Sequence, residues 1–198
     1  CVPAGMVDSR RDRRDEIKET ARALIARDGA AALSLGSIAR ALGISTPALY
    51  RYFASRDALV TALVVDGYAD LGDKTEHAVR DLDPADYGAR FRAIAHAYRA
   101  WALAHPQDYV LIHGAVVPGY RAPLAEIATA AVKILRLFVG VLSDAEAAGA
   151  LALPPAYQDV PTGVGRALQP LTGGGGPPRL GTVTYLVWAQ LHPLVWPE

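Results

Sequence analysis

The chain has 198 residues, of which 52% are hydrophobic, and its formal net charge at pH 7 is zero. A chain of this length builds one or two domains with a sizeable core, and its neutrality excludes a uniformly basic nucleic-acid binder. The charge is unevenly spread, because residues 1–60 hold ten Lys or Arg and seven Asp or Glu, which leaves the remainder net acidic. A weakly basic head on a weakly acidic body fits contact with DNA through one end.

Cysteine usage and apolar runs restrict the compartment. The single cysteine, Cys1, excludes an internal disulfide and a cysteine zinc cluster. The charged N-terminus lacks the apolar core of a signal peptide. The longest apolar stretch, residues 182–196, is interrupted by polar residues and proline and is shorter than the roughly 18–20 residues that span a bilayer. We therefore expect a cytoplasmic protein with no membrane partner.

Residues 12–28 form the first expected helix, with Asp12 and Asp15 as a capping pair and Gly29 as its stop. Its inner stripe consists of Ile17, Ala21, Leu24 and Ile25. Four arginines precede or begin the helix, namely Arg10, Arg11, Arg13 and Arg14. They are either a solvated tail or a flexible arm that touches phosphates or the minor groove.

Residues 34–53, SLGSIARALGISTPALYRYF, predict two short helices joined by a tight turn. Ser34 caps the first helix, and Gly43 ends it in a left-handed conformation at no Cβ cost. The first helix buries a stripe at helical spacing, formed by Leu35, Ile38, Ala39 and Leu42. Two helices across a short glycine turn form either a helix-turn-helix motif, whose second helix enters the major groove of DNA, or an ordinary helical hairpin.

The second helix opens with a hydroxyl cap at Ser45, followed by Thr46 and a proline, Pro47, at the first helical position. Leu49 and Phe53 face inward at i, i+4. The remaining positions look outward or sideways and carry no acidic residue, namely Ala48, Tyr50, Arg51 and Tyr52. The following helix places Arg56 in its first turn, where a cation opposes the helix dipole and a phosphate would favour it.

The segment LSLGSIARALGISTPALYRYFASRDALV resembles the DNA-binding domain of the tetracycline-repressor (TetR) family of bacterial transcription regulators, over about residues 12–63. The resemblance implies an all-α fold with a three-helix head, residues 1–54, which binds DNA. It also implies a helical body, residues 55–198, which binds a ligand and dimerises.

DNA contact is expected from the second helix of the motif and its surroundings. Arg51 can read guanine bidentately, and Tyr50 either contacts DNA or packs. The candidates for base contact are Thr46, Pro47, Tyr50 and Arg51, with Ser45 beside them, and the candidates for phosphate contact are Ser34, Tyr52 and Arg56.

The body shows helices throughout and no β pattern. Expected helices cover residues 55–74, 86–105, 107–116 and 123–148, a poorly specified one near 162–171, and a last one from 179. Residues 154–178 are rich in proline and glycine and predict a linker. Residues 104–109 (AHPQDY), 118–120 (PGY) and 188–192 (WAQLH) resemble a subgroup of actinobacterial regulators.

An effector pocket is expected in the body because the helix at 86–105 carries more rings than a minimal core needs. Ligand pockets are mostly apolar with a few polar groups. The candidates are Phe91, Tyr98, Trp101, Tyr109, His113, Phe138 and Trp188. Core packing is the alternative for each residue. The absence of a buried charge cluster favours a neutral or weakly polar, partly aromatic small molecule.

A two-fold dimer is expected, because two heads reading successive major grooves need a palindromic site. The family dimerises through its last two helices, here near residues 162–171 and 179–196. The expected contacts are Val183, Val187, Leu191 and Leu194. His192-Pro193 stands where the family usually has His-Gly, and the proline shortens the helix and weakens the expected contact.

Catalytic motifs are absent from the sequence. None of the five histidines stands in an HExxH context, and no GxSxG, P-loop or GxGxxG occurs. We therefore expect no catalytic residues, no metal and no cofactor. The sequence predicts a ligand-responsive regulator, most often a repressor in this family. The alternative is a helical protein-interaction scaffold or a small helical enzyme without DNA binding.

Overall fold

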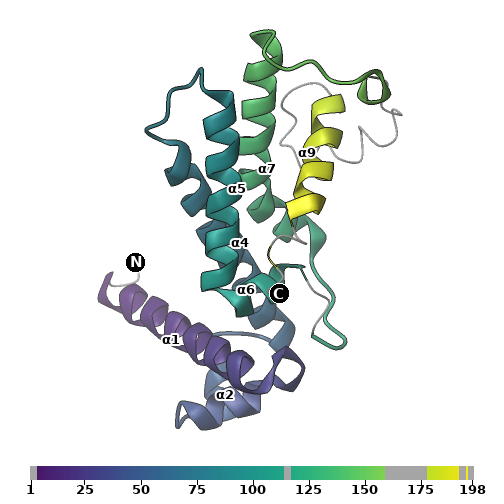
Figure 1. Cartoon of the computed structure of the whole chain (residues 1–198). Coiled ribbons are helices and arrows are strands. Elements are labelled where there is room, and N and C mark those ends of the chain that lie inside the picture. Colours follow the sequence, from purple (N-terminus) through teal and green to yellow (C-terminus); the bar gives the residue numbers. More distant parts are fainter. Residues whose placement is uncertain (1–3, 114–116, 159–177, 192–194, 196–198) are drawn as a thin grey trace. The chain divides into compact units, whose positions relative to one another are not determined.

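The computed structural model describes residues 4–113, 117–158, 178–191 and 195, and every regular element within these ranges is helical (Figure 1). The elements are α1 (Ala4–Asp28), η1 (Ala30–Ala32), α2 (Leu35–Ala41), α3 (Thr46–Tyr50), α4 (Arg56–Val79), α5 (Tyr87–Ala104), α6 (Pro106–His113), α7 (Leu124–Ala147), η2 (Pro155–Tyr157) and α9 (Pro178–Leu191). The all-α architecture predicted from the sequence is confirmed. No helix in the described ranges has the length and apolar character needed to cross a membrane.

The chain groups into two compact units. The first unit contains residues 1–67 and 106–123, and the second contains residues 68–105 and 124–198. Packing therefore places α6 with the helix-turn-helix segment, although the two are far apart in sequence. The boundary expected after residue 54 remains a prediction from the sequence.

Helix α1 begins earlier than the capping pattern predicted. It starts at Ala4 instead of Asp12, so Asp12 lies inside the helix and does not cap it. The preceding residues include alanine, methionine and arginine, which are strong helix formers, and their propensity extends the helix. Arg10, Arg11, Arg13 and Arg14 are therefore helical, which corrects the alternative of a flexible arm. The predicted inner stripe is buried, as shown by Ile17, Ala21, Leu24 and Ile25.

Helix α4 runs from Arg56 to Val79, one turn beyond the expected end near residue 74. Ser55 Oγ caps it by accepting from Ala58 N–H at 3.0 Å. In the second unit, a Cβ on Gly72 would lie only 2.9 Å from Cδ of Lys133 on α7. Gly72 therefore lets the lysine stem cross α4 closely, and Lys133 Nζ then pairs with Glu76 at 2.8 Å.

The core of the second unit lies among α5, α7 and α9, which stand side by side in Figure 1. Its fully buried large side chains include Ile94, Tyr98, Ile134, Phe138 and Leu180. Arg90 Nη1 pairs with Asp144 at 2.9 Å and joins α5 to α7. Arg179 Nη2 pairs with Glu146 at 2.9 Å and joins the start of α9 to the end of α7. These two helices therefore run antiparallel.

The residues that α9 exposes are not the ones that were expected at the dimer contact. Leu191 is buried within its own chain, and Val183 and Val187 are half-buried, because α9 turns this side toward α7. Tyr185 and Leu186 are the large apolar residues that α9 exposes, at 47% and 41%. Residues 162–171 and Leu194, also expected at the contact, lie outside the described residues.

Candidate DNA-binding face

Helix α2 is capped by a pair of serines. Ser34 Oγ accepts from Ser37 N–H at 3.0 Å, and Ser34 N–H donates to Ser37 Oγ at 3.2 Å. This capping box satisfies N–H groups that the start of the helix leaves free. Leu35, Ile38 and Ala39 are buried on the inner side of α2. The cap that the sequence predicted at Ser34 therefore begins the motif.

The turn and the start of α3 follow the predicted chemistry with one shift. Gly43 takes φ +65°, the left-handed conformation expected there. Ser45 Oγ accepts from Ala48 N–H at 3.3 Å and caps α3. Thr46 is then the first helical residue and Pro47 the second, one position later than expected. The shift is harmless, because the second N–H of a helix also lacks an intrahelical partner.

Two buried side chains anchor α3 and turn its other face outward. Leu49 is fully buried and Phe53 is 2% exposed, as the i, i+4 spacing predicted. Tyr50 is 53% exposed, so it does not pack in the core. The other candidates range from half-buried to exposed, namely Thr46, Pro47, Arg51 and Tyr52. The motif therefore offers an aromatic and cationic surface along its second helix.

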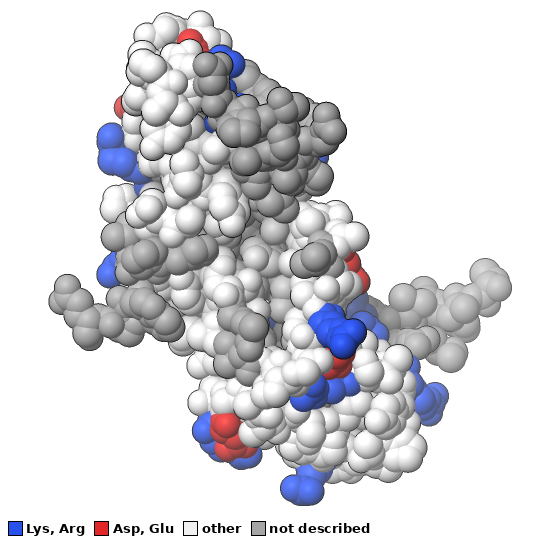
Figure 2. Space-filling view, turned by 90° about the vertical axis from the view of Figure 1, so that its right-hand side faces the viewer, with Lys and Arg blue, Asp and Glu red and all other residues white. Residues whose placement is uncertain are grey.

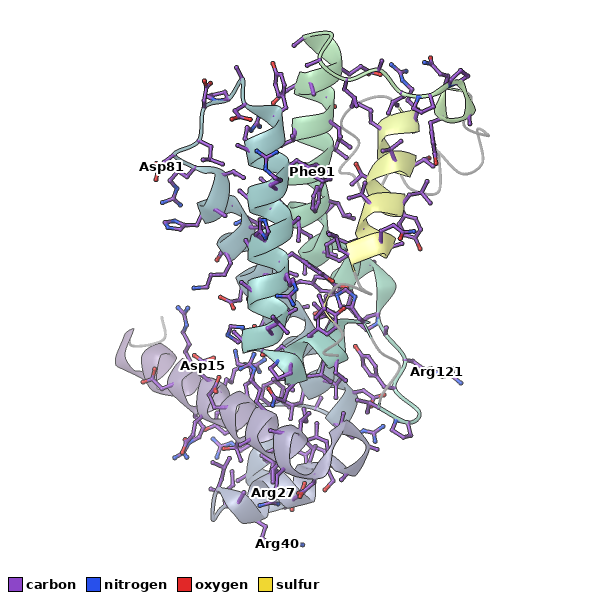
Figure 3. All side chains as sticks on the ribbon, viewed as in Figure 1. Asp15, Arg27, Arg40, Asp81, Phe91 and Arg121 are labelled. Carbon is purple, nitrogen blue, oxygen red and sulfur yellow. The ribbon has the colours of Figure 1, made fainter. Side chains whose placement is uncertain are left out.

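The charges of this surface have one sign. Residues 34–56 contain three arginines and no Asp or Glu. Arg40 and Arg51 are exposed, and Figure 3 shows Arg40 pointing away from the chain near the end of α2. A short motif without carboxylates avoids repulsion from DNA phosphates.

Arg14 holds the end of the helix-turn-helix motif from α1. Its guanidinium lies 4.2 Å from the centre of the Phe53 ring, and Nη1 donates to the carbonyl oxygen of Tyr52. This cation–π contact and hydrogen bond satisfy a carbonyl that follows α3. Arg14 is therefore a structural residue, and its contact with Tyr52 spans 38 positions, so no local pattern could predict it.

Arg56 also has partners inside the first unit. Its Nη2 donates to the carbonyl oxygen of Pro118 at 2.8 Å, and both Nε and Nη2 lie 3.3 Å from Asp57 Oδ1. The expectation of a phosphate contact rested on the cost of a cation in the first turn of α4. These oxygens offset that cost, so the helix-dipole argument no longer requires a phosphate. Phosphate contact by Arg56 remains a prediction.

Ion pairs tie α1 to α4 and α6 within the first unit. Lys18 Nζ lies 2.7 Å from Asp66 Oδ2, and Arg22 Nε lies 3.0 Å from Asp108 Oδ1. Burial lowers the pKa of Lys18, but hydrogen bonds from its ammonium to Asp15 and Asp66 outweigh burial and raise the pKa above its usual value. Lys18 therefore stays charged at neutral pH, and the ion pairs join segments distant in sequence.

The expected effector residues divide between the two units. In the second unit, Phe91 meets Phe138 edge-on with ring centres 5.3 Å apart, and Figure 3 shows Phe91 lying toward α7. Tyr98 meets Trp188 in the same manner at 5.2 Å. Trp101 is buried in this unit as well. The two remaining candidates, Tyr109 and His113, belong to the first unit, and their ring centres lie 4.7 Å apart.

The second unit also contains polar groups that bear on an effector site. Trp101 Nε1 donates to Asp70 Oδ2 at 2.6 Å and its ring stacks on His105, so Asp70 is a neighbour that the sequence analysis missed. In the described part of the chain, Thr184 Oγ1 and Ser143 Oγ are buried without a hydrogen-bond partner. Buried hydroxyls normally have hydrogen-bond partners, so these two are candidates for a contact with water or a ligand.

No three His, Cys, Asp or Glu side chains among the described residues gather in an arrangement that could hold a metal ion. The first unit combines two capped helices, a left-handed glycine turn between them and an outer surface without carboxylates. Together they define a DNA-binding protein of the helix-turn-helix class.

Comparison with known proteins places this motif in a family. Residues 17–63 match the family model described as bacterial regulatory proteins, tetR family, and residues 91–195 match the one described as tetracyclin repressor-like, C-terminal domain. The HTH-type transcriptional regulator Rv1816 of Mycobacterium tuberculosis is 36% identical over 189 residues, which cover 92% of this chain and 80% of the relative. The regulator Mb1846 of Mycobacterium bovis matches to the same extent.

A solved structure agrees over nearly the whole length. The crystal structure of a regulatory protein, SCO4313, has a TM-score of 0.75 and 34% identity, and the match covers 98% of this chain and 86% of that one. A structure from Rhodococcus sp. RHA1 has a TM-score of 0.61 and 28% identity, covering 89% and 94%. The chain belongs to the TetR family of helix-turn-helix transcriptional regulators, as the sequence predicted. This family is not enzymatic, so the enzyme alternative is excluded.

Proposed function

We propose that this regulator is a cytoplasmic repressor that binds a palindromic operator as a homodimer and leaves it when a small molecule binds its body. The observation that supports DNA binding is the outer surface of α2 and α3, which has arginines and no carboxylate. Relatives that share 36% of its residues carry the description HTH-type transcriptional regulator, which supports the same role.

Base reading is assigned to the exposed side of α3. Tyr50 and Arg51 are exposed there, and Thr46 and Pro47 stand at the helix start, where recognition helices meet base edges. Arg51 suits guanine, because its donors match the two acceptors of that base. Phosphate contact is assigned to the residues around α3, namely Ser34, Tyr52 and Arg56, and Ser45 stands beside the residues assigned to base reading.

Dimer formation is assigned to α9. Tyr185 and Leu186 leave adjoining apolar side chains exposed on this helix. Among the residues of α9, Pro178–Leu191, only Arg179 is charged, and Figure 2 shows that most of the described surface on its side of the molecule is uncharged. An apolar surface with few charges suits contact with a second copy, and two copies would present two recognition helices to a palindrome.

Effector binding is assigned to the second unit. Phe91, Phe138, Tyr98 and Trp188 supply ring surfaces, and Trp101 lies in the same unit. The fully buried polar side chains described in this unit are Thr75 and Thr184, and neither carries a charge. An ionic ligand would need a buried counter-charge. The Asp70 carboxylate beside Trp101 already accepts from the indole N–H. The interior therefore suits a neutral, partly aromatic molecule that hydrogen-bonds to hydroxyl groups.

A mobility-shift experiment with the intergenic DNA upstream of the gene tests the DNA role. We expect the protein to shift this DNA specifically. Arg51→Ala should reduce the discrimination against a wrong base at the contacted base pair by about 1–3 kcal/mol. Arg27→Ala is the matched control, because Arg27 is exposed on α1 and pairs with its neighbour Asp28. Absence of any specific shift, or equal loss in both variants, would contradict the proposal and favour a protein-interaction scaffold.

A further inference from the structure

The turn that follows α6 packs on the first two turns of α4. Tyr120 N–H donates to Val117 O at 3.1 Å and closes the turn, and Gly119 takes φ +75° within it. Val117 is 5% exposed. The hydroxyl groups of Tyr120 and Thr61 lie 3.0 Å apart. The turn is thus fixed to α4 by burial and by a side-chain hydrogen bond, all within the first unit.

This turn presents a carbonyl to Arg56. Pro118 O accepts from Nη2 at 2.8 Å, which is shorter than the 3.3 Å that separates Arg56 from Asp57 Oδ1. Asp57 Oδ1 meets the edge of the guanidinium formed by Nε and Nη2, and Pro118 O meets Nη2. No described residue forms a hydrogen bond with Nη1, and the side chain is 31% exposed. Nη1 is therefore the nitrogen of Arg56 that is left for a partner outside the chain.

We propose that the turn formed by residues 117–120 positions Arg56, so that the guanidinium meets a DNA phosphate through Nη1 while Pro118 holds Nη2. The inference rests on the proposed DNA role of Arg56. An arginine loses rotamer freedom when it binds, and a side chain that is already held loses less. Gly119 and Tyr120 are then positioning residues for a phosphate contact, although they lie more than 60 positions after α3 in the sequence.

Gly119→Ala tests the proposal directly. The carbonyl of Pro118 belongs to the peptide that joins it to Gly119, and alanine is strained at φ +75°. The added Cβ would lie 4.0 Å from Arg56 Nη2, so the variant redirects the carbonyl without a steric clash. The matched control is Gly149→Ala in the second unit, where φ is +71° and no heavy atom lies within 4 Å of the new Cβ.

The probe is a mixed-sequence duplex of about 30 base pairs, because phosphate contacts do not depend on base sequence. We expect Gly119→Ala to weaken binding about three- to ten-fold, the size of one ordinary hydrogen bond, because the phosphate contact is weakened and not removed. Gly149→Ala should bind as the parent does. Tyr120→Phe removes the bond to Thr61 and should act in the same direction, which keeps the test available if Gly119→Ala does not fold.

Arg56→Ala tells whether the turn variants weaken DNA binding through Arg56 or by disturbing the fold. It should weaken binding and reduce the slope of log affinity against log salt by about one. Adding Gly119→Ala or Tyr120→Phe to Arg56→Ala should cause no further loss, because the turn acts through Arg56. Additional loss in the double variant, or tighter binding by the turn variants, would overturn the positioning role. If Arg56→Ala itself leaves binding unchanged, the phosphate role of Arg56 fails instead.

Discussion

Arg22 Nε donates to both carboxylate oxygens of Asp108, at 3.0 and 3.2 Å, and this contact joins α1 to α6 within the first unit. The Asp108 side chain is 10% exposed and that of Arg22 is 22% exposed. Burial lowers the pKa of Arg22, but the hydrogen bond to Asp108 and the attraction of Asp108, Glu19 and Asp66 together outweigh burial, and the pKa is raised. The pair thus fixes α6 to the helix that supports the DNA-binding motif.

Removing one member of this pair should destabilise the protein. Arg22→Met leaves the Asp108 carboxylate buried without the guanidinium, and we expect a loss of about 2–3 kcal/mol in the free energy of unfolding. Urea denaturation measures the loss. Arg27→Met, which breaks an exposed pair on the same helix, is the control and should cause no measurable change.

Replacing both members should recover much of that stability. In Arg22→Met/Asp108→Leu no buried charge is left unpaired, and apolar packing can substitute for the ion pair. The double variant should therefore be more stable than Arg22→Met alone. A double variant as unstable as Arg22→Met would show that the helices need the ion pair itself.

Alkaline pH should destabilise the fold through Tyr68. Burial raises the pKa of Tyr68 to about 12, from about 10 in an unfolded chain. The folded state therefore holds the phenol proton more tightly, and stability is lost as pH rises from about 10 to about 12. By pH 11 the loss should be about 1 kcal/mol. Urea denaturation at constant ionic strength should show a shallower decline for Tyr68→Phe, and equal declines would contradict the assignment.

Dimer dissociation should follow a charge on the exposed side of α9. Leu186→Asp places a carboxylate in the proposed contact and should raise the dimer dissociation constant at least about ten-fold, since desolvating an unpaired charge is costly. Sedimentation or light scattering at micromolar concentration measures this. Leu103→Asp on α5 is the control, because Leu103 is 45% exposed and Leu186 is 41% exposed. A parent protein that is monomeric throughout would refute the dimer.

Local features were predictable because their causes lie within four residues of one another. Ser34 and Ser45 cap the helices that directly follow them, and Gly43 adopts the left-handed conformation of the turn. Leu49 and Phe53 are four residues apart and both are buried. Cap chemistry and spacing therefore suffice to locate them. The predicted start of α1 was wrong. Asp12 was interpreted as a cap, but the residues before it have enough helix propensity to continue the helix to Ala4.

Long-range contacts had no such signal. Arg56 meets Pro118 across 62 positions, and Arg22 meets Asp108 across 86. Each contact depends on packing that brings α6 and its turn to the head, and a residue's type does not reveal it. The same limit applies to the effector residues. The sequence indicated a group of aromatic rings, but it could not show that Tyr109 and His113 belong to the first unit and the other candidates to the second.

The last prediction concerns Thr184, which is fully buried on α9 with a hydroxyl that has no partner in the described structure. Thr184→Val keeps the shape and removes the unsatisfied group, so the ligand-free protein should gain about 1 kcal/mol in the free energy of unfolding. If this hydroxyl instead binds the effector, the same variant should still bind operator DNA but lose release by the effector. Thermal unfolding and induction screening measure the two effects. A loss of stability in the ligand-free protein would show that the hydroxyl already has a hydrogen-bond partner, and unchanged release of DNA by the effector would remove Thr184 from the effector site.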